Sequence, residues 1–317
     1  MIRQFIAVAS ATLLACGTLP PASAEVPDRI GWAIGPAGDA GDEVQLELSY
    51  RTATSNSTWN SSTGLAELQG LDRAQLDAGS GTEVRFRIVR EAGRFDCEGT
   101  VRRGRGTGDC SFAPDTGFAD ALAQRGVGRP DREDSFHLTL ARVGIALLDE
   151  LARLDYRTPD VSDLVAAGIH RVDVDYVRAM AEAGYRVGTV DGLVTMRIHR
   201  VTPEYVHALE AAGYRPDADM AVQMRIHGIS PDYIRDLAAA GGGRFTTEDL
   251  VAMRIHGVTP AFVTELGELG YRDLSAGNLT AMRIHGVTGD FVRRQIGEGG
   301  DRPTADELVS RRIHGGR

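Results

Sequence analysis

The sequence reads Met-Arg-Ile-His-Gly-Val-Thr-Pro from Met253 to Pro260, and close variants of these eight residues recur through the second half of the chain. Its histidine has counterparts 28 or 29 residues apart, each preceded by isoleucine: His170, His199, His227, His256, His285 and His314. Self-similarity at a fixed period of this size is typical of repeat proteins, in which every repeat is one small unit of secondary structure. The spacing therefore predicts an array of about 29-residue units over residues 134–317.

Each unit reads as two short helices. Thr202, Ser230 and Thr259 favour helix N-caps, and each precedes a proline, which favours the first helical position. The other helix of a unit is expected to end at the histidine, for example over residues 193–199. Helices this short bury too little apolar surface alone, so the units must stack on one another. We expect an α-helical solenoid with a degenerate first unit over residues 143–157 and a last unit reduced to its first helix.

The earlier part of the chain has the period of strands. Apolar and polar residues alternate over residues 44–50 and 84–88, as in antiparallel strands with one face in water. Short helices are expected over residues 65–76 and 118–124, and glycine, proline and charged residues over 126–134 indicate a boundary. The expected fold class is α+β with two domains, an antiparallel β-rich domain over residues 25–133 and the helical repeat domain over residues 134–317.

Two cysteines of the β-rich part are placed to meet. If a two-residue turn lies at Arg103-Gly104, the strands on either side bring Cys97 opposite Cys110 and Phe95 opposite Phe112, all on one face. This register predicts a disulfide, and the alternative is two buried thiols. A metal site is not expected, because neither another cysteine nor a nearby histidine completes a ligand set.

The first 24 residues have the three zones of a secretory signal peptide: Arg3, an apolar run from Phe5 to Ala15, and Ala22-Ser23-Ala24 before Glu25. The apolar run is too short to span a bilayer, which takes roughly 20 residues. A second interpretation stays open, because Leu13-Leu14-Ala15-Cys16 resembles the site at which bacterial lipoproteins are lipidated. Both predict an exported protein, either periplasmic or secreted, or anchored by lipid at Cys16.

Composition excludes several classes of function. All 35 basic residues are arginine, which excludes mechanisms that need a lysine side chain, such as P-loop nucleotide hydrolysis, kinase chemistry and Schiff-base catalysis. The formal net charge of −9 argues against nucleic-acid binding. Motifs typical of zinc peptidases, serine hydrolases and dinucleotide enzymes are missing from the sequence, so we predict no catalytic residues, no metal and no cofactor.

The repeated residues suggest roles of their own. The histidines cannot share a metal, because stacked helices lie about 8 to 10 Å apart. We expect the imidazoles to bond the last carbonyls of their helices; a role in sensing pH or holding a ligand is the alternative. The arginines that precede the isoleucines form either a solvated or paired face or a surface for an anionic ligand: Arg197, Arg225, Arg254, Arg283 and Arg312. We expect the isoleucines to pack between stacked units: Ile198, Ile226, Ile255 and Ile284.

The segment from Met253 to Leu274 resembles a repeat of exported bacterial proteins that also occurs in the extracytoplasmic tail of some membrane-bound zinc peptidases of the beta-lactam-sensor, antirepressor type. Residues 118–122 and 128–130 resemble the segment that precedes those repeats. The peptidase domain, with its membrane helices and zinc motif, has no counterpart here, so the resemblance implies a sensing or interaction module without proteolytic activity. Tyr214 and Tyr271 keep a tyrosine of the repeat that Gly242 and Gly300 replace, which puts uniform packing in doubt there.

Together these features predict a non-enzymatic extracytoplasmic binding, scaffold or sensing module that acts through the surface of its helical repeats. Its expected partner is another envelope protein or an anionic envelope ligand. The alternative is a cell-envelope hydrolase with its site in the N-terminal domain.

Overall fold

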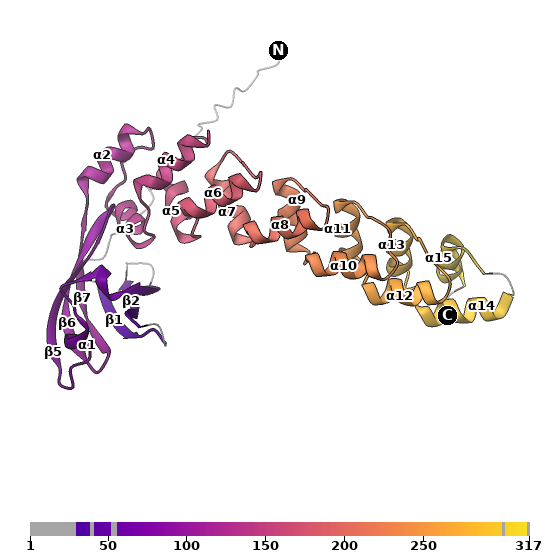
Figure 1. Cartoon of the computed structure of the whole chain (residues 1–317), viewed down its shortest axis with the longest axis horizontal. Coiled ribbons are helices and arrows are strands. Elements are labelled where there is room, and N and C mark those ends of the chain that lie inside the picture. The colour runs from indigo at the N-terminus through magenta and orange to yellow at the C-terminus, as the bar shows by residue number, and fades with distance from the viewer. Residues whose placement is uncertain (1–29, 39–40, 52–55, 300–301, 316–317) are drawn as a thin grey trace, which may run out of the picture. The chain divides into compact units, whose positions relative to one another are not determined.

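The computed structural model describes residues 30–38, 41–51, 56–299 and 302–315. The expected signal peptide and the alternative anchor Cys16 lie outside these residues. A seven-stranded antiparallel sheet is followed by a long series of helices (Figure 1), so the predicted α+β class with two parts is confirmed. Within the described ranges, no helix has both the length and the apolar composition that a membrane crossing requires.

Strand order in the sheet is β3-β2-β1-β7-β6-β5-β4. The strand β1 pairs with both β2 and β7, so residues early in the chain lie between two later strands. The strands are β1 (Ile30–Pro36), β2 (Glu43–Arg51), β3 (Asn56–Gly64), β4 (Leu68–Gln69), β5 (Thr82–Arg90), β6 (Gly93–Arg102) and β7 (Arg105–Pro114).

The indole of Trp32, a residue of β1, lies over glycines of the neighbouring β6–β7 hairpin. Its Nε1 donates to the carbonyl oxygen of Glu98 at 3.0 Å, and its ring packs edge-on against Phe86. A Cβ atom on Gly108 would lie 2.6 Å from Nε1 and 2.0 Å from the Glu98 carbonyl oxygen. Glycine at this position is therefore a requirement of packing around the indole.

The β6–β7 hairpin has the predicted turn and disulfide. Arg103 and Gly104 both have positive φ, as a two-residue turn between antiparallel strands requires. Cys97 and Cys110 are joined by a disulfide, with their Cα atoms 4.0 Å apart. Phe95 and Phe112 are neighbours on the same buried face, with ring centroids 5.4 Å apart.

The helix expected over residues 65–76 is wrong for most of its length. This segment forms a 3-10 turn (Leu65–Glu67), the short strand β4 and only then the helix α1 (Arg73–Leu76). Gly70 has a φ of 102°, which ends regular structure, and the side chain of Asp72 caps α1. The second expected helix is confirmed as α2 (Thr116–Gln124), whose N-cap is Asp115.

The remaining helices come in consecutive pairs. Most are nine residues long and begin at a side-chain cap; the caps expected at Thr202, Ser230 and Thr259 are present and are followed by proline. The helices are α3 (Arg132–Leu140), α4 (Ile145–Arg153), α5 (Val161–Ile169), α6 (Val174–Glu182), α7 (Val190–Ile198), α8 (Pro203–Ala211), α9 (Ala218–Ile226), α10 (Pro231–Ala239), α11 (Thr247–Ile255), α12 (Pro260–Glu268), α13 (Ala276–Ile284), α14 (Gly289–Gly299) and α15 (Ala305–His314).

Alternate helices pack against one another. The odd-numbered helices from α3 to α15 form one row and the even-numbered helices from α2 to α14 form another (Figure 1). We call each odd helix and the even helix after it a unit. Equivalent residues of successive units therefore lie in rows that run from one unit to the next.

The whole chain divides into two compact bodies, at a place that the sequence does not mark. Residues 87–96 and 112–317 form one body, and the remaining strands form the other. The end of the β5–β6 hairpin thus belongs with the helices. The sequence placed the domain boundary at residue 133.

Candidate functional site at the Arg-Ile-His turns

The repeated isoleucines face solvent, so the expectation that they pack between units is wrong. Ile198 is 50% exposed and Ile226, Ile255 and Ile284 are each 54% exposed. Ile169 and Ile313, at the equivalent positions of α5 and α15, are exposed to a similar extent. Each described unit from α5 onward therefore presents one large apolar side chain at the end of its odd helix.

Helix geometry explains the correction. Met253 lies two residues before Ile255 and is fully buried. At 3.6 residues per turn, side chains two positions apart point about 200° away from each other. One must face outward when the other faces the core. After the turn, the chain returns to the core at Val258, and this pattern of buried methionine, exposed isoleucine and buried aliphatic residue recurs in α7, α9 and α13.

The five arginines that precede these isoleucines stack on aromatic rings of the preceding unit. Their Cζ atoms lie 4.4 to 5.3 Å from the ring centroids. The pairs are Arg197 on Tyr176, Arg225 on Tyr205, Arg254 on Tyr233, Arg283 on Phe262 and Arg312 on Phe291. Such stacking stabilises by roughly 0.5 to 1 kcal/mol at exposed positions. The row therefore helps to join successive units.

None of these five arginines forms an ion pair or a hydrogen bond within the described part of the chain. The Nε of Arg225 is buried without a hydrogen-bond partner. Carboxylates in the first turns of the even helices pair with arginines of their own helix: Asp175 with Arg178, Asp232 with Arg235 and Asp290 with Arg293. Glu204 accepts a hydrogen bond from Thr202, which lowers its pKa, and Arg197 adds a smaller attraction. The row thus keeps positive charge that the chain does not pair.

The histidines stand where the sequence places them but do not act as expected. His199, His227, His256 and their equivalents in α5 and α13 are C-cap residues, and it is their backbone N–H groups that donate to carbonyls of the last turn. Among the described residues, their imidazoles form no hydrogen bond or ion pair. The imidazoles are therefore available beside the isoleucines. We call the Arg-Ile-His side chains at the ends of α7, α9, α11, α13 and α15, together with Ile169 and His170 at the end of α5, the turn surface.

Buried tyrosines tie each unit to the next beneath this surface. The hydroxyl groups of Tyr176, Tyr205 and Tyr233 donate to the carbonyl oxygens of Val201, Ile229 and Val258 at 2.8 to 2.9 Å. Burial raises the pKa of Tyr176 and that of Tyr205 to about 12. Sequence reasoning missed both the hydroxyl bond and the stacked arginine.

Removing one of these hydroxyl groups should weaken the array. We expect Tyr205→Phe to lower the free energy of unfolding by about 0.5 to 1.5 kcal/mol, because the carbonyl of Ile229 loses its donor. Phe262→Tyr is the matched variant in the opposite direction, since Phe262 occupies the equivalent position without a hydroxyl and should gain stability. Denaturant unfolding of both variants measures this. Equal stability of Tyr205→Phe and the parent would contradict it.

A second row of tyrosines, which follow the even helices α6, α8 and α12, is interrupted after α10. Tyr185, Tyr214 and Tyr271 donate to the carbonyl oxygens of Pro216, Phe245 and Pro303. Gly242 takes the place of a tyrosine and lines a cavity of about 480 Å³, but a similar cavity of about 390 Å³ lies at Tyr185 and Tyr214, where the tyrosine is kept. The irregular packing expected at Gly242 therefore stays a prediction, and Gly300 lies outside the described residues.

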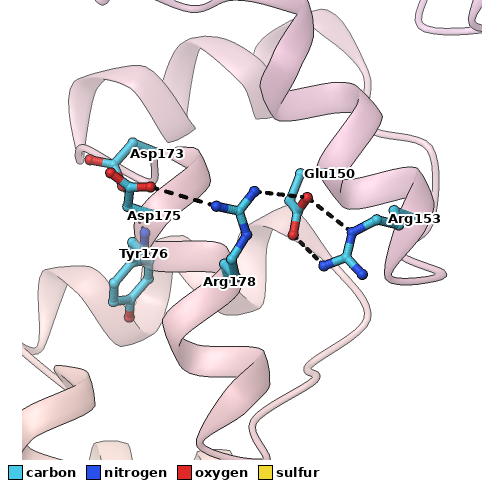
Figure 2. A network of polar contacts seen from close by, with 6 residues as sticks. All are labelled: Glu150, Arg153, Asp173, Asp175, Tyr176 and Arg178. Carbon is cyan, nitrogen blue, oxygen red and sulfur yellow. Dashed lines mark hydrogen bonds and ion pairs between the residues drawn. The ribbon is translucent and has the colours of Figure 1, made fainter.

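Glu150 is the most strongly perturbed carboxylate in the described chain and lies away from the turn surface. It is buried in α4 between Arg153 and Arg178, as Figure 2 shows. The hydrogen bonds from Arg153 lower its pKa from 4.5 to about 2, with a further contribution from Arg178 and partial opposition from burial. A carboxylate with this pKa holds no proton at neutral pH and is unsuited to general acid catalysis. The network therefore links α4 to α6.

This network should make the free energy of unfolding depend on pH in the acid range. Because the pKa of Glu150 is lower in the folded state, its contribution is complete above pH 4.5 and is lost as the pH falls toward 2. We expect Glu150→Gln to be less stable than the parent at pH 7 and to lose less stability over that window. Asp175→Asn is the control, because Asp175 contacts the same Arg178 from an exposed position. Parallel pH profiles for Glu150→Gln and the parent would contradict the assignment.

No group of three metal-binding side chains is gathered among the residues that the structure describes. Comparison of the chain with known protein families, with curated proteins and with solved structures finds no match.

Proposed function

We propose that this protein is a non-enzymatic extracytoplasmic binding or scaffold protein that engages its partner through the turn surface. The observation that carries the proposal is the row of outward isoleucines, repeated in register from α5 to α15 and accompanied from α7 onward by arginines without an ion-pair partner among the described residues. Single exposed apolar residues are ordinary on protein surfaces, but an apolar side chain kept outward in every unit from α5 onward marks an interaction surface.

The architecture fits this role. Alternate helices contact one another in two rows, which supports a solenoid built from nearest-neighbour contacts. Arrays of this kind offer one extended surface on which equivalent residues meet a long partner. Each unit adds the same small contact, so affinity comes from their number.

The location is part of the proposal. The Cys97–Cys110 disulfide supports an oxidising compartment, and the N-terminal sequence pattern supports export. The resemblance to the tails of membrane zinc peptidases of the beta-lactam-sensor type supports a sensing or interaction module over an enzyme.

Site-specific photocrosslinking in the cells that export the protein tests the proposal. A photoreactive residue is placed at Ile226 or Ile255 in the full chain, and at Val89 as the control, because Val89 is 51% exposed but lies outside the turn surface. We expect adducts at Ile226 and Ile255 and none at Val89. Absence of any adduct at the two isoleucines, whatever its chemical nature, would overturn the proposal.

A further inference from the structure

We propose that the turn surface, taken as the binding site proposed above, receives a polypeptide segment that carries apolar side chains flanked by aspartate or glutamate. The inference rests on the proposed function and names the class of partner. Three features of the chain itself lead to it.

The first feature is that one turn in the row is already covered by polypeptide. Leu140, which ends α3, lies 29 residues before Ile169 and so occupies the isoleucine position of the first unit. Leu138 and Leu140 are both fully buried, although two residues so spaced point to opposite sides of a helix. Both sides of this helix end are therefore covered, whereas in later units one side is open.

The second feature is the chemistry of that cover. Arg90, at the end of β5, donates to the carbonyl oxygens of Thr139 and Leu140 at 2.7 and 2.9 Å. Glu91, next in the chain, accepts a hydrogen bond from the backbone N–H of Ile145 at 2.8 Å. A hairpin end with a carboxylate thus lies on the turn between α3 and α4. The first unit shows that this edge accommodates a polypeptide segment.

The third feature is a difference between the first unit and the later units in which polar groups need a partner from outside the unit. In later units the N-terminus of the even helix is capped by a side chain of the unit itself, Asp173 in α6 and a threonine or serine such as Thr202 afterwards, so a carboxylate in the position of Glu91 is not needed. The unpaired donors are instead the arginines. A guanidinium stacked on a ring uses its face, and its accessible N–H groups, which in Arg225 do not include the buried Nε, can bind carboxylates. The turn surface therefore complements a partner segment that places apolar groups opposite the isoleucines and carboxylates opposite the arginines.

Charge favours a polypeptide over an anionic membrane. The chain has a formal net charge of −9, and an extended anionic surface would repel it wherever the two approach. A short acidic segment meets mainly the local arginines, because charges beyond about 8 to 10 Å are screened at physiological salt.

A displayed library of random 15-residue peptides, selected on the full exported chain, tests the inference. Peptides that also bind the variant Ile226→Ser/Ile255→Ser/Ile284→Ser are removed. We expect the enriched sequences to combine apolar residues with aspartate or glutamate. Synthetic copies with Asp→Asn and Glu→Gln replacements should bind at least about tenfold more weakly, since each charge-assisted bond is stronger than its neutral counterpart.

Matched arginine variants locate the charges. Arg225→Gln/Arg254→Gln/Arg283→Gln should lose the binding that the acidic peptides show. Arg105→Gln/Arg186→Gln/Arg272→Gln removes the same charge from exposed arginines elsewhere and should retain it. Thermal melts verify that both triple variants fold, and the peptide replacements give the same answer without altering the protein.

Several outcomes would overturn the inference: enrichment of basic peptides, no enrichment over the isoleucine variant, or sedimentation with vesicles of anionic phospholipid that depends on the same isoleucines. Crosslinks at Ile255 to lipid or glycan would leave the proposed function standing and refute the polypeptide. Absence of all crosslinks would refute both.

Discussion

Leu266→Ala should lower the free energy of unfolding by about 2 to 5 kcal/mol, whereas Ile255→Ala should change it by less than about 0.5 kcal/mol. Leu266 is fully buried in α12, and truncation leaves a cavity in the packed row of even helices. Ile255 has more than half of its surface in water and leaves none. Denaturant unfolding followed by helical circular dichroism measures both variants.

Met253→Ala completes the comparison, because Met253 shares the helix α11 with Ile255 and is fully buried. Met253→Ala should lower the free energy of unfolding by about as much as Leu266→Ala does. A large loss of stability in Ile255→Ala would place that isoleucine in an interface within the chain and remove the basis of the turn surface.

Loss of the disulfide should have the next largest effect and lower the free energy of unfolding by about 3 kcal/mol, the value of the chain-entropy model for a loop of this length. The bond closes a loop between positions separated by 13 residues, so its removal frees the unfolded chain more than the folded one. The variant Cys97→Ala/Cys110→Ala should therefore melt at a lower temperature than the parent.

Treatment with reductant distinguishes the effect of losing the bond from the effect of replacing the cysteine side chains. It should lower the melting temperature of the parent and leave that of the double variant unchanged. Alkylation of the purified protein without reductant should label neither Cys97 nor Cys110 in mass spectrometry. Two alkylated thiols would contradict the disulfide.

Local patterns made the helix ends and the hairpin predictable. A cap at Thr202, Ser230 or Thr259 needs only a side-chain oxygen within reach of a backbone N–H three residues on, which sequence shows directly. The disulfide followed in the same way, because a two-residue turn fixes the register of both strands. The segment over residues 65–76 failed, since its apolar residues fit a helix while Gly70 breaks it.

The outward position of the isoleucines was also contained in the sequence and was misread. Methionine and isoleucine two residues apart cannot both face one core, and the aliphatic residue after the turn, such as Val258, competes for the same space. Weighing all three positions together would have placed the isoleucine outside.

By itself, the sequence determined the period, the pairs of short helices, their caps and the disulfide hairpin, because each depends on residues close in the chain. Only the tertiary structure decided which residues meet between units. The stacking of Arg225 on Tyr205, the bond from that tyrosine to Ile229 and the link from Glu150 to Arg178 all join neighbouring units. The same holds for Leu140, which reads as one more repeat position but is buried where the end of the β5–β6 hairpin bonds the carbonyls of α3. Such contacts depend on how separate elements pack, and a repeat pattern specifies which positions are equivalent without specifying what covers them.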